Sequence, residues 1–366
     1  MQHLSMYFLG ISAFATVLYI LLQSPSWEPD EGSLTTSHQM HKGKSPLHIV
    51  VVSCGQRVQE TLVMIKSALL FNTYEEYLKF VIFTENSVTD EFREKLTDWK
   101  DLLPYAFDFE LLQLKFPNQN EVEWKNLFKP CAAQRLFLPS LLTNVDSLLY
   151  VDTDVLFLSP ISDLWTFFKK FNETQMAALT PEHESENIGW YNRFARHPFY
   201  GKLGVNSGVM LMNLTRMREF NWEKQILPIH KEYKLRITWG DQDIINILFY
   251  YHPDKLYVMP CEYNYRPDHC MYMSVCSTSR FGIKLIHGNR GYFHFDKQPL
   301  FKIVYEIIES YPLGSNPYTN FLLPLRRALN QQSVNDSSCG KISSDVLKIS
   351  STLFDDLSEA LYKDDR

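Results

Sequence analysis

Short apolar runs alternate with helical patterns from residue 47 onward. The run at 47–54, LHIVVVSC, is continuous and rich in β-branched residues, which is typical of a buried parallel strand. Between residues 58 and 71, apolar side chains recur at helical spacing. The beginning of this region therefore predicts a strand followed by a helix.

The same alternation continues through most of the chain. Strand patterns occupy 78–84, 107–114, 147–158 and 205–214, helical patterns occupy 90–99, 132–142 and 241–251, and a strand runs into a loop at 281–291. Such alternation predicts an α/β fold, with βαβ units and helices on both faces of a parallel sheet. Ligands bind beyond the carboxyl ends of such strands, so the turn at Cys54 and Gly55 is a candidate nucleotide site.

The first 22 residues have a different pattern. Residues 4–22 form nineteen positions without a charge, about 28 Å of helix, which is close to the thickness of a bilayer core. The length of the run and the polar residues after it favour an uncleaved transmembrane signal-anchor, with a cleaved signal peptide as the alternative. Acidic residues follow the run, which predicts a cytosolic tail at 1–3 and a lumenal body, as in a type II membrane protein.

Composition divides the remainder into three parts. Residues 23–46 are polar and contain Pro, Gly, Ser and Thr, and we interpret them as a flexible stem. Residues 47–325 carry the strand and helix patterns and form the predicted folded domain. Residues 326–366 are more polar, with an amphipathic stretch near 346–361, which predicts a C-terminal helix or tail.

Overall composition narrows the class of partner. The formal net charge is −6, so no strongly basic surface is available to neutralise phosphates, and nucleic acid is excluded as a partner. Aromatic residues make up 14%, which suits either carbohydrate binding or a well-packed core. Three N-glycosylation sequons, at Asn172, Asn213 and Asn335, agree with a lumenal body.

Six cysteines leave several interpretations open. Three of them fall between Cys261 and Cys276, where a disulfide, a zinc site with His269 and Cys270, or free buried thiols are the alternatives. No C-x-x-C spacing occurs, and a lumenal location favours a disulfide. The pairing itself does not follow from the sequence.

The central chemical signal is the pair Asp152 and Asp154, which follows four apolar residues. Carboxylates beside an apolar run are costly unless a cation or hydrogen bonds compensate them. We predict a Mg²⁺ or Mn²⁺ site that bridges the phosphates of a nucleotide-sugar; a loop-fixing pair is the alternative.

A second signal lies in the loop that begins with His287. Its imidazole beside carboxylate oxygens suits Mn²⁺ better than Mg²⁺, although alone it would be a satisfied loop histidine. Gly288 and Gly291 allow close approach of the backbone to phosphates, and Arg290 and Lys297 are cations for a diphosphate.

Two further segments place polar side chains in apolar surroundings. In TWGDQD, one of the residues Asp241, Gln242 and Asp243 is expected to cap a helix while the others face a sugar. In VNSG, Asn206 and Ser207 interrupt an apolar run and either fix a turn or bind a ligand.

Together these segments resemble a known family. YVDTDVLFL, VNSGVMLMNL, TWGDQD and HGNRG, in this order and spacing, resemble glycosyltransferase family 8. FKPCAAQRLFLP, IGWYNRFARHPFYGK and YNYRPDHC are similar to the animal glucoside xylosyltransferases within it. The resemblance covers about residues 47–325 and implies a GT-A-type nucleotide-diphospho-sugar transferase fold, with a mixed, mostly parallel sheet and a metal site.

The resemblance also implies an activity. Such enzymes transfer xylose from UDP-xylose, in α1,3 linkage and with retention of configuration, to O-linked glucose on EGF-like repeats of Notch-type receptors. The catalytic domain would lie in the lumen of the endoplasmic reticulum or Golgi.

Site roles follow from the matched motifs. Asp152, Asp154 and His287 resemble the Mn²⁺ ligands, and the turn at Ser53, Cys54 and Gly55 resembles the part that holds uridine. The other residues that resemble donor-binding positions are Arg135, Thr153, Asn206, Ser207, Asp241, Gln242 and Gly288. The segment from His287 to Lys297 is longer than is common in the family, which leaves either Lys297 or Arg290 as the diphosphate ligand.

Gln242 resembles the residue beside the anomeric carbon, with Asp241 next to it. An amide is a poor nucleophile, which favours attack from the face of the leaving group over a covalent intermediate. Asp241 and Gln242 would then orient and polarise the substrates.

The alternative functions are a retaining UDP-glucose or UDP-galactose transferase with another acceptor, a catalytically inactive lumenal sugar-binding protein, and, more weakly, a nucleotide-sugar hydrolase.

Overall fold

The computed structural model describes residues 45–72, 76–103, 106–117, 121–125, 127 and 131–357. The cytosolic tail and the signal-anchor expected at 1–22, nearly all of the stem, and the last nine residues lie outside this part. Within the described part, none of the helices has the length and apolar character needed to cross a membrane.

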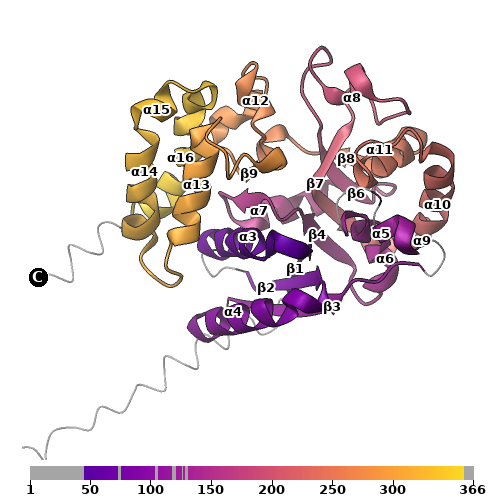
Figure 1. Cartoon of the computed structure of the whole chain (residues 1–366), viewed down its shortest axis with the longest axis horizontal. Coiled ribbons are helices and arrows are strands. Elements are labelled where there is room, and N and C mark those ends of the chain that lie inside the picture. The colour runs from indigo at the N-terminus through magenta and orange to yellow at the C-terminus, as the bar shows by residue number, and fades with distance from the viewer. Residues whose placement is uncertain are drawn as a thin grey trace, which may run out of the picture. The chain divides into compact units, whose positions relative to one another are not determined.

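A seven-stranded mixed sheet forms the centre of the described domain (Figure 1). Its spatial order is β3-β2-β1-β4-β7-β6-β8. The first four of these strands are parallel, β7 runs antiparallel between β4 and β6, and β6 pairs in parallel with β8. The prediction of an α/β fold with a mixed, mostly parallel sheet is confirmed. The strands, in chain order, are β1 (Leu47–Ser53), β2 (Leu78–Thr84), β3 (Phe107–Gln113), β4 (Ser147–Val151), β6 (Ala177–Pro181), β7 (Val205–Asn213) and β8 (Leu256–Val258).

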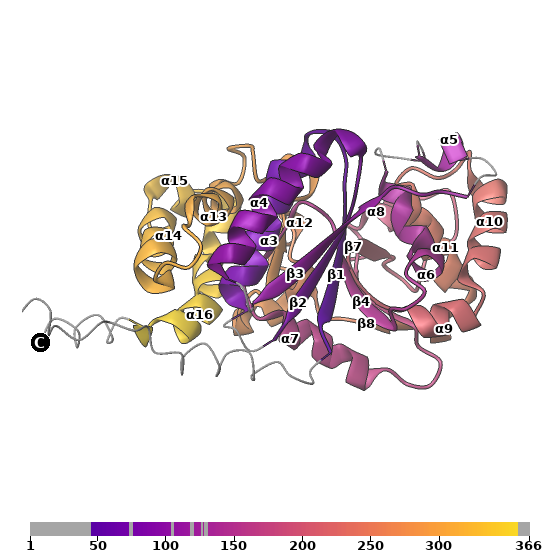
Figure 2. The same ribbon diagram turned by 90° about the horizontal axis from the view of Figure 1, so that it is seen from below.

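Helices cover both faces of this sheet, as Figure 2 shows for α3 and α4 on one side and α10 and α11 on the other. Successive side chains of β1 point to opposite faces of the sheet, as in any β-strand. Ile49 packs in one core cluster with Leu62 of α3 and Leu96 of α4, while Val50 packs in another with Ile245 of α11. Burial on both faces is why the strand patterns are continuously apolar.

The helices vary in length, and several are single turns. Their bounds are α3 (Val58–Phe71), α4 (Thr89–Leu102), α5 (Glu121–Lys125), α6 (Leu138–Leu141), α7 (Ile161–Trp165), α8 (Trp190–Phe194), α9 (Leu214–Glu219), α10 (Trp222–Tyr233), α11 (Asp241–Tyr251), α12 (Asp268–Met271), α13 (Pro299–Ser310), α14 (Leu323–Leu329), α15 (Gln332–Asn335) and α16 (Ser343–Phe354).

The C-terminal helices α13 to α16 form a layer of their own beside α3 (Figure 1). A third core cluster joins Phe71 of α3 to Phe301 of α13, Leu325 of α14 and Phe354 of α16. The predicted amphipathic stretch at 346–361 thus contributes a helix, Ser343–Phe354, which packs its apolar side against this layer.

Two predicted elements differ from the structure. The helix expected at 132–142 is a 3₁₀ helix over Ala132–Phe137 followed by the one-turn helix α6. The strand expected at 147–158 is divided into β4 and the short strand β5 (Val155–Phe157), because the chain turns at the two aspartates. β5 pairs with β9 (Leu285–His287) outside the main sheet.

Three disulfides connect the six cysteines: Cys54–Cys131, Cys261–Cys276 and Cys270–Cys339. The predicted disulfide in the loop at 261–276 is therefore confirmed. The zinc alternative is wrong, because all three of its cysteines are oxidised in disulfides and have no thiolate to offer. The Cys270–Cys339 bond ties α12 to the C-terminal layer.

Removing these bonds should destabilise the domain according to the loop that each closes. The sequence separations are 69 residues for Cys270–Cys339 and 15 for Cys261–Cys276, so chain entropy gives losses of roughly 4 and about 3 kcal/mol respectively. Urea unfolding of the two double alanine variants, followed by circular dichroism, measures both. A larger loss for the shorter loop would contradict the argument.

Candidate functional site

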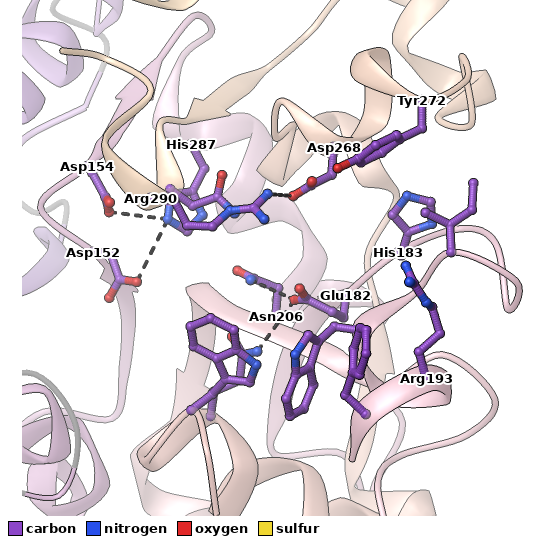
Figure 3. Close-up of a pocket in the computed structure, with 16 residues that line it drawn as sticks. Asp152, Asp154, Glu182, His183, Arg193, Asn206, Asp268, Tyr272, His287 and Arg290 are labelled. Carbon is purple, nitrogen blue, oxygen red and sulfur yellow. Dashed lines mark hydrogen bonds and ion pairs between the residues drawn. The ribbon is translucent and has the colours of Figure 1, made fainter. Parts of the chain in front are cut away.

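The turn between β4 and β5 brings the two predicted carboxylates together with the imidazole. β5 pairs antiparallel with β9, and the register sets Val155 opposite His287, so the histidine lies beside Asp154. His287 Nε2 is 3.2 Å from Asp154 Oδ1 and 4.0 Å from Asp152 Oδ2 (Figure 3). One ligand atom from each of the three residues lies within 4.8 Å of the others, a spacing that suits a single divalent cation.

Hydrogen bonds fix which imidazole nitrogen faces the carboxylates. The Asn206 Oδ1 atom accepts from the backbone N–H of Gly208 at 3.0 Å, which fixes the orientation of that amide, since a backbone N–H only donates. Asn264 Nδ2 donates to the same oxygen at 2.9 Å, so Asn264 Oδ1 must face His287 Nδ1, also at 2.9 Å. His287 Nδ1 therefore donates to Asn264, and Nε2 is the nitrogen that faces the carboxylates, which is the orientation of a metal-binding histidine.

Gly208 makes this arrangement sterically possible. A Cβ atom at this position would lie 2.3 Å from His287 Cε1 and 3.1 Å from Asp152 Oδ2. The backbone oxygen of Gly208 also accepts a hydrogen bond from the N–H of Asp152 at 2.8 Å. The glycine in VNSG is thus required by the close approach of β7 to the cluster.

The buried guanidinium of Arg135 connects the cluster to the start of α11. It donates to Asp152 Oδ1 at 2.7 Å and to the Ser207 carbonyl at 2.5 Å, and its Nε forms an ion pair with Asp241. Burial lowers the pKa of Arg135, but Asp152 and Asp241 outweigh burial and raise it above its usual value. Burial also raises the pKa of the Asp241 carboxyl to about 6, against the opposing effect of Arg135.

The Gln242 amide has one orientation because of its partners. Its Oε1 accepts from the backbone N–H of Ser207 at 3.1 Å, so Nε2 points away, 3.2 Å from the hydroxyl of Tyr191 and 3.5 Å from Glu182 Oε2. Asn206 Nδ2 donates to the same Glu182 oxygen at 2.9 Å (Figure 3). Hydrogen bonds therefore run continuously from His287 to Asn264 and Asn206, and from there to Glu182 and Gln242.

Two cavities meet at this cluster. The first has a volume of about 630 Å³ and the second about 620 Å³, and Asp152, Asp154, Trp239 and Gln242 line both. The first is also lined by Glu182, Trp190, Arg193, Asn206, Tyr272, His287 and Arg290. The second is also lined by Cys54, Gly55, Arg57, Arg135, Thr153, Ser207 and Asp241.

Most of the residues predicted from the sequence line these cavities; those that do not are Ser53, Asp243, Gly288, Gly291 and Lys297. Ser53 is fully buried, and its hydroxyl accepts from Thr61 Oγ1 at 2.9 Å. Gly288 lies against the ring of Phe293, and its N–H donates to the Asp154 carbonyl at 2.8 Å. Lys297 is exposed and lines neither cavity, whereas Arg290 lines the first and forms an ion pair with Asp268.

Asp243 takes a structural role. Its Oδ2 accepts from the N–H groups of Thr238 and Trp239 at 2.7 and 2.8 Å, and its Oδ1 accepts from the Tyr191 hydroxyl. It holds the loop before α11 rather than facing a cavity, as expected for one residue of TWGDQD.

Sequence reasoning missed several residues of the site, among them Glu182, Asn264, Trp239 and Arg57. Glu182 directly follows β6, where a polar residue at a strand end is a usable signal. Asn264 lies in YNYRPDHC, and Arg57 follows Gly55 by two residues. Nothing in the sequence indicates which of these face a cavity, since that depends on contacts between distant segments.

The three sequons differ in accessibility. Asn172 and Asn335 are exposed. Asn213 is half-buried, and its side chain caps α9 by accepting from the N–H of Arg216 at 2.9 Å. Asn172 and Asn335 are therefore the better placed for glycosylation.

Comparison with known proteins agrees with this geometry. Residues 48–287 match the family model "Glycosyl transferase family 8". Mouse "Glucoside xylosyltransferase 2" is 52% identical over 314 residues, covering 82% of this chain and 70% of the relative. Human "Glucoside xylosyltransferase 1" is 50% identical over 308 residues, covering 81% and 69%.

Among solved structures, the galactosyltransferase LgtC in complex with donor and acceptor sugar analogues is similar, with a TM-score of 0.59 at 16% identity. The match covers 75% of this chain and all of LgtC. At that identity the likeness shows the fold alone, and it confirms a GT-A-like architecture.

Replacing Asn264 should weaken cation binding without removing a ligand. In Asn264→Ala, the His287 ring loses the acceptor that fixes its tautomer, and we expect the Kd for Mn²⁺ to rise about 10–100-fold. Calorimetric titration of the purified domain with Mn²⁺ measures this.

The matched control is Asn72→Ala, which removes another buried asparagine whose amide instead donates to the carbonyl of Glu76 at 2.7 Å, at the end of α3. If Asn264→Ala binds Mn²⁺ as tightly as the control variant does, Asn264 has no specific role toward the cluster.

Proposed function

The chain belongs to glycosyltransferase family 8, and on that premise we propose that it transfers xylose from UDP-xylose to a glucoside, with retention of configuration. The observation that carries the proposal is the convergence of Asp152, Asp154 and His287 at the junction of two cavities. The identity of about half to proteins named glucoside xylosyltransferase supports xylose as the transferred sugar and a glucoside as the acceptor.

The three residues fit a divalent cation, and we propose Mn²⁺. A neutral imidazole whose Nε2 lone pair is exposed toward two carboxylates is a donor set suited to this ion. When bound, the ion would stabilise the charge that develops on the diphosphate as the sugar departs. Asp152 is held in place for this role by Arg135 and by the backbone of Gly208.

In this proposal the second cavity takes the UDP part of the donor. Cys54, Gly55 and Thr153 line it where β1 and β4 finish, and Arg57 adds a cation. Gln242 lines both cavities and Asp241 the second, which suits contacts with the donor sugar. Arg290 is the better candidate than Lys297 for the diphosphate, since Arg290 lines the cleft.

Attack from the leaving-group face accounts best for retention here. Gln242 is an amide whose oxygen is already engaged by Ser207, which makes it a poor nucleophile, and Asp241 is engaged by Arg135. The fixed amide would orient the sugar, and a diphosphate oxygen would accept the proton of the attacking hydroxyl.

We further propose the biological setting expected from the sequence. The acceptor would be O-linked glucose on EGF-like repeats of Notch-type receptors, extended in α1,3 linkage, in the lumen of the endoplasmic reticulum or Golgi. Three disulfides suit an oxidising compartment. The signal-anchor at 4–22, the stem at 23–46, the catalytic domain at 47–325 and the C-terminal segment at 326–366 complete the proposed organisation.

Assays with a panel of UDP-sugars test the proposal. The purified domain, with and without Mn²⁺, should use UDP-xylose far better than UDP-glucose or UDP-galactose on a glucosylated EGF-like repeat. Asp154→Ala should lower kcat about a thousandfold or more, because it removes a ligand from a cation that supplies several kcal/mol of charge stabilisation.

Asp254→Ala, which changes an exposed aspartate elsewhere, is the control and should keep normal turnover. Preference for another UDP-sugar would contradict the donor assignment. Near-normal turnover of Asp154→Ala at saturating Mn²⁺ would contradict the site.

The stereochemistry of the product tests the mechanism. We expect the ¹H NMR spectrum of early product to show an α-xyloside, and intact-mass spectrometry of the enzyme with donor alone to show no sugar adduct. A trapped adduct on Glu182, Asp241 or Asp243 would overturn same-face attack in favour of a covalent intermediate.

A further inference from the structure

The first cavity has an aromatic wall that the proposed donor chemistry does not use. Trp190 and Phe194 of α8 line this cavity and not the second, and Trp239 lines both. The two indole rings are 5.5 Å apart and inclined at 73° to each other. They therefore form a corner, in which one ring meets the edge of the other.

This corner is attached rigidly to the start of α11. Trp239 is held through its backbone N–H by Asp243, at 2.8 Å. Tyr191, which follows Trp190, donates its hydroxyl to the other oxygen of Asp243 and accepts from Gln242 and from Asn246. The position of α8 relative to the Gln242 amide is thus set by one buried tyrosine.

A glycine leaves room for this tyrosine. Gly204 has a φ of +67°, and a Cβ atom there would lie 2.3 Å from the Tyr191 ring. Any larger residue would push α8, and Trp190 with it, away from Gln242.

The rest of the cavity offers polar groups near the corner. Glu182 and Asn206 lie between the metal cluster and Arg193, as Figure 3 shows. Half-buried indoles beside carboxylate and amide groups are the combination that a pyranose ring requires: its C–H face packs against an aromatic ring while its hydroxyls form hydrogen bonds. A volume of about 630 Å³ is sufficient for one sugar and part of its aglycone.

We propose that Trp190 and Trp239 form the stacking platform for the acceptor glycoside, and that Trp190 determines whether the activated sugar is transferred to a sugar hydroxyl or to water. The inference deepens the proposed function and rests on it. Trp190 lines the first cavity and not the second, which is proposed for UDP, so its role concerns the acceptor more than the donor. The segment that carries it, IGWYNRFARHPFYGK, is also one of the segments that resemble the glucoside xylosyltransferases in particular.

The test compares Trp190→Ala and Trp190→Phe with the unchanged domain, using UDP-xylose, Mn²⁺ and an alkyl β-glucoside. We expect Trp190→Ala to raise the KM for the glucoside about tenfold and to lower the ratio of transferred to hydrolysed xylose by a similar factor. The KM for UDP-xylose should change less than twofold. Trp190→Phe, which keeps an aromatic face, should recover most of both losses.

Phe281→Ala, which removes an exposed aromatic ring outside both cavities, is the control and should match the unchanged domain. If the unchanged domain transfers xylose but Trp190→Ala keeps its glucoside KM and its transfer ratio, the inference alone is overturned. The same holds if the KM for UDP-xylose rises as much as that for the glucoside. If the unchanged domain transfers no xylose to any glucoside, the proposed function is overturned and this inference with it.

Discussion

The site depends on a single backbone constraint: the chain must leave the sheet between β4 and β5 and then pair with β9. A strand that continued straight would keep Asp152 and Asp154 on one face, but it would stay paired with β7 in the main sheet and not reach β9. The turn instead brings the chain beside β9, and the β5–β9 register adds His287 to the two carboxylates from 133 positions later in the chain. Because the pairing is made of main-chain hydrogen bonds, the position of the imidazole is set by the fold and not by its own loop.

Around the Asp152, Asp154 and His287 side chains, hydrogen bonds between neutral amides fix how each neighbouring side chain is oriented. A backbone N–H fixes Asn206, Asn206 fixes Asn264, and Asn264 fixes the tautomer of His287. A second backbone N–H, that of Ser207, fixes Gln242. Amides suit this purpose because each has a distinct donor and acceptor end, so one fixed group determines the next without adding charge beside a cation.

The extent to which this site follows from the sequence depends on the range of the interactions. The Asp152 and Asp154 carboxylates follow from local pattern as a candidate site, since carboxylates after apolar residues need compensation, but the break of the strand expected at 147–158 does not. The helix Val58–Phe71 and the strands β1 and β2 follow in the same way from periodicity. Local pattern did not give the split of the predicted helix at 132–142, nor the pairing of the cysteines.

Long-range packing decided the rest. Ser53 is a polar residue at a strand end and therefore a reasonable candidate, yet Thr61 engages it inside the protein. Glu182 has the same local character and does face a cavity. The difference arises from distant segments: α3 places Thr61 against Ser53, whereas Glu182 contacts Asn206 of β7 and Gln242 of α11, and no window of sequence around either residue contains that information.

The first turn of α11 also explains why the two cavities meet at one place. Asp241 and Gln242 are consecutive residues at the first turn of α11, and successive side chains of a helix turn by about 100°, so they point in different directions. Asp241 turns toward Arg135 and the second cavity, while Gln242 faces both cavities, toward Ser207 and Glu182. A single helix start thus touches the groups that would hold the donor and those that would face the acceptor, and Tyr191 ties the acceptor wall to the same turn. Any shift of α11 would therefore move the groups on both sides together, because Arg135, Ser207 and Tyr191 all contact its first turn.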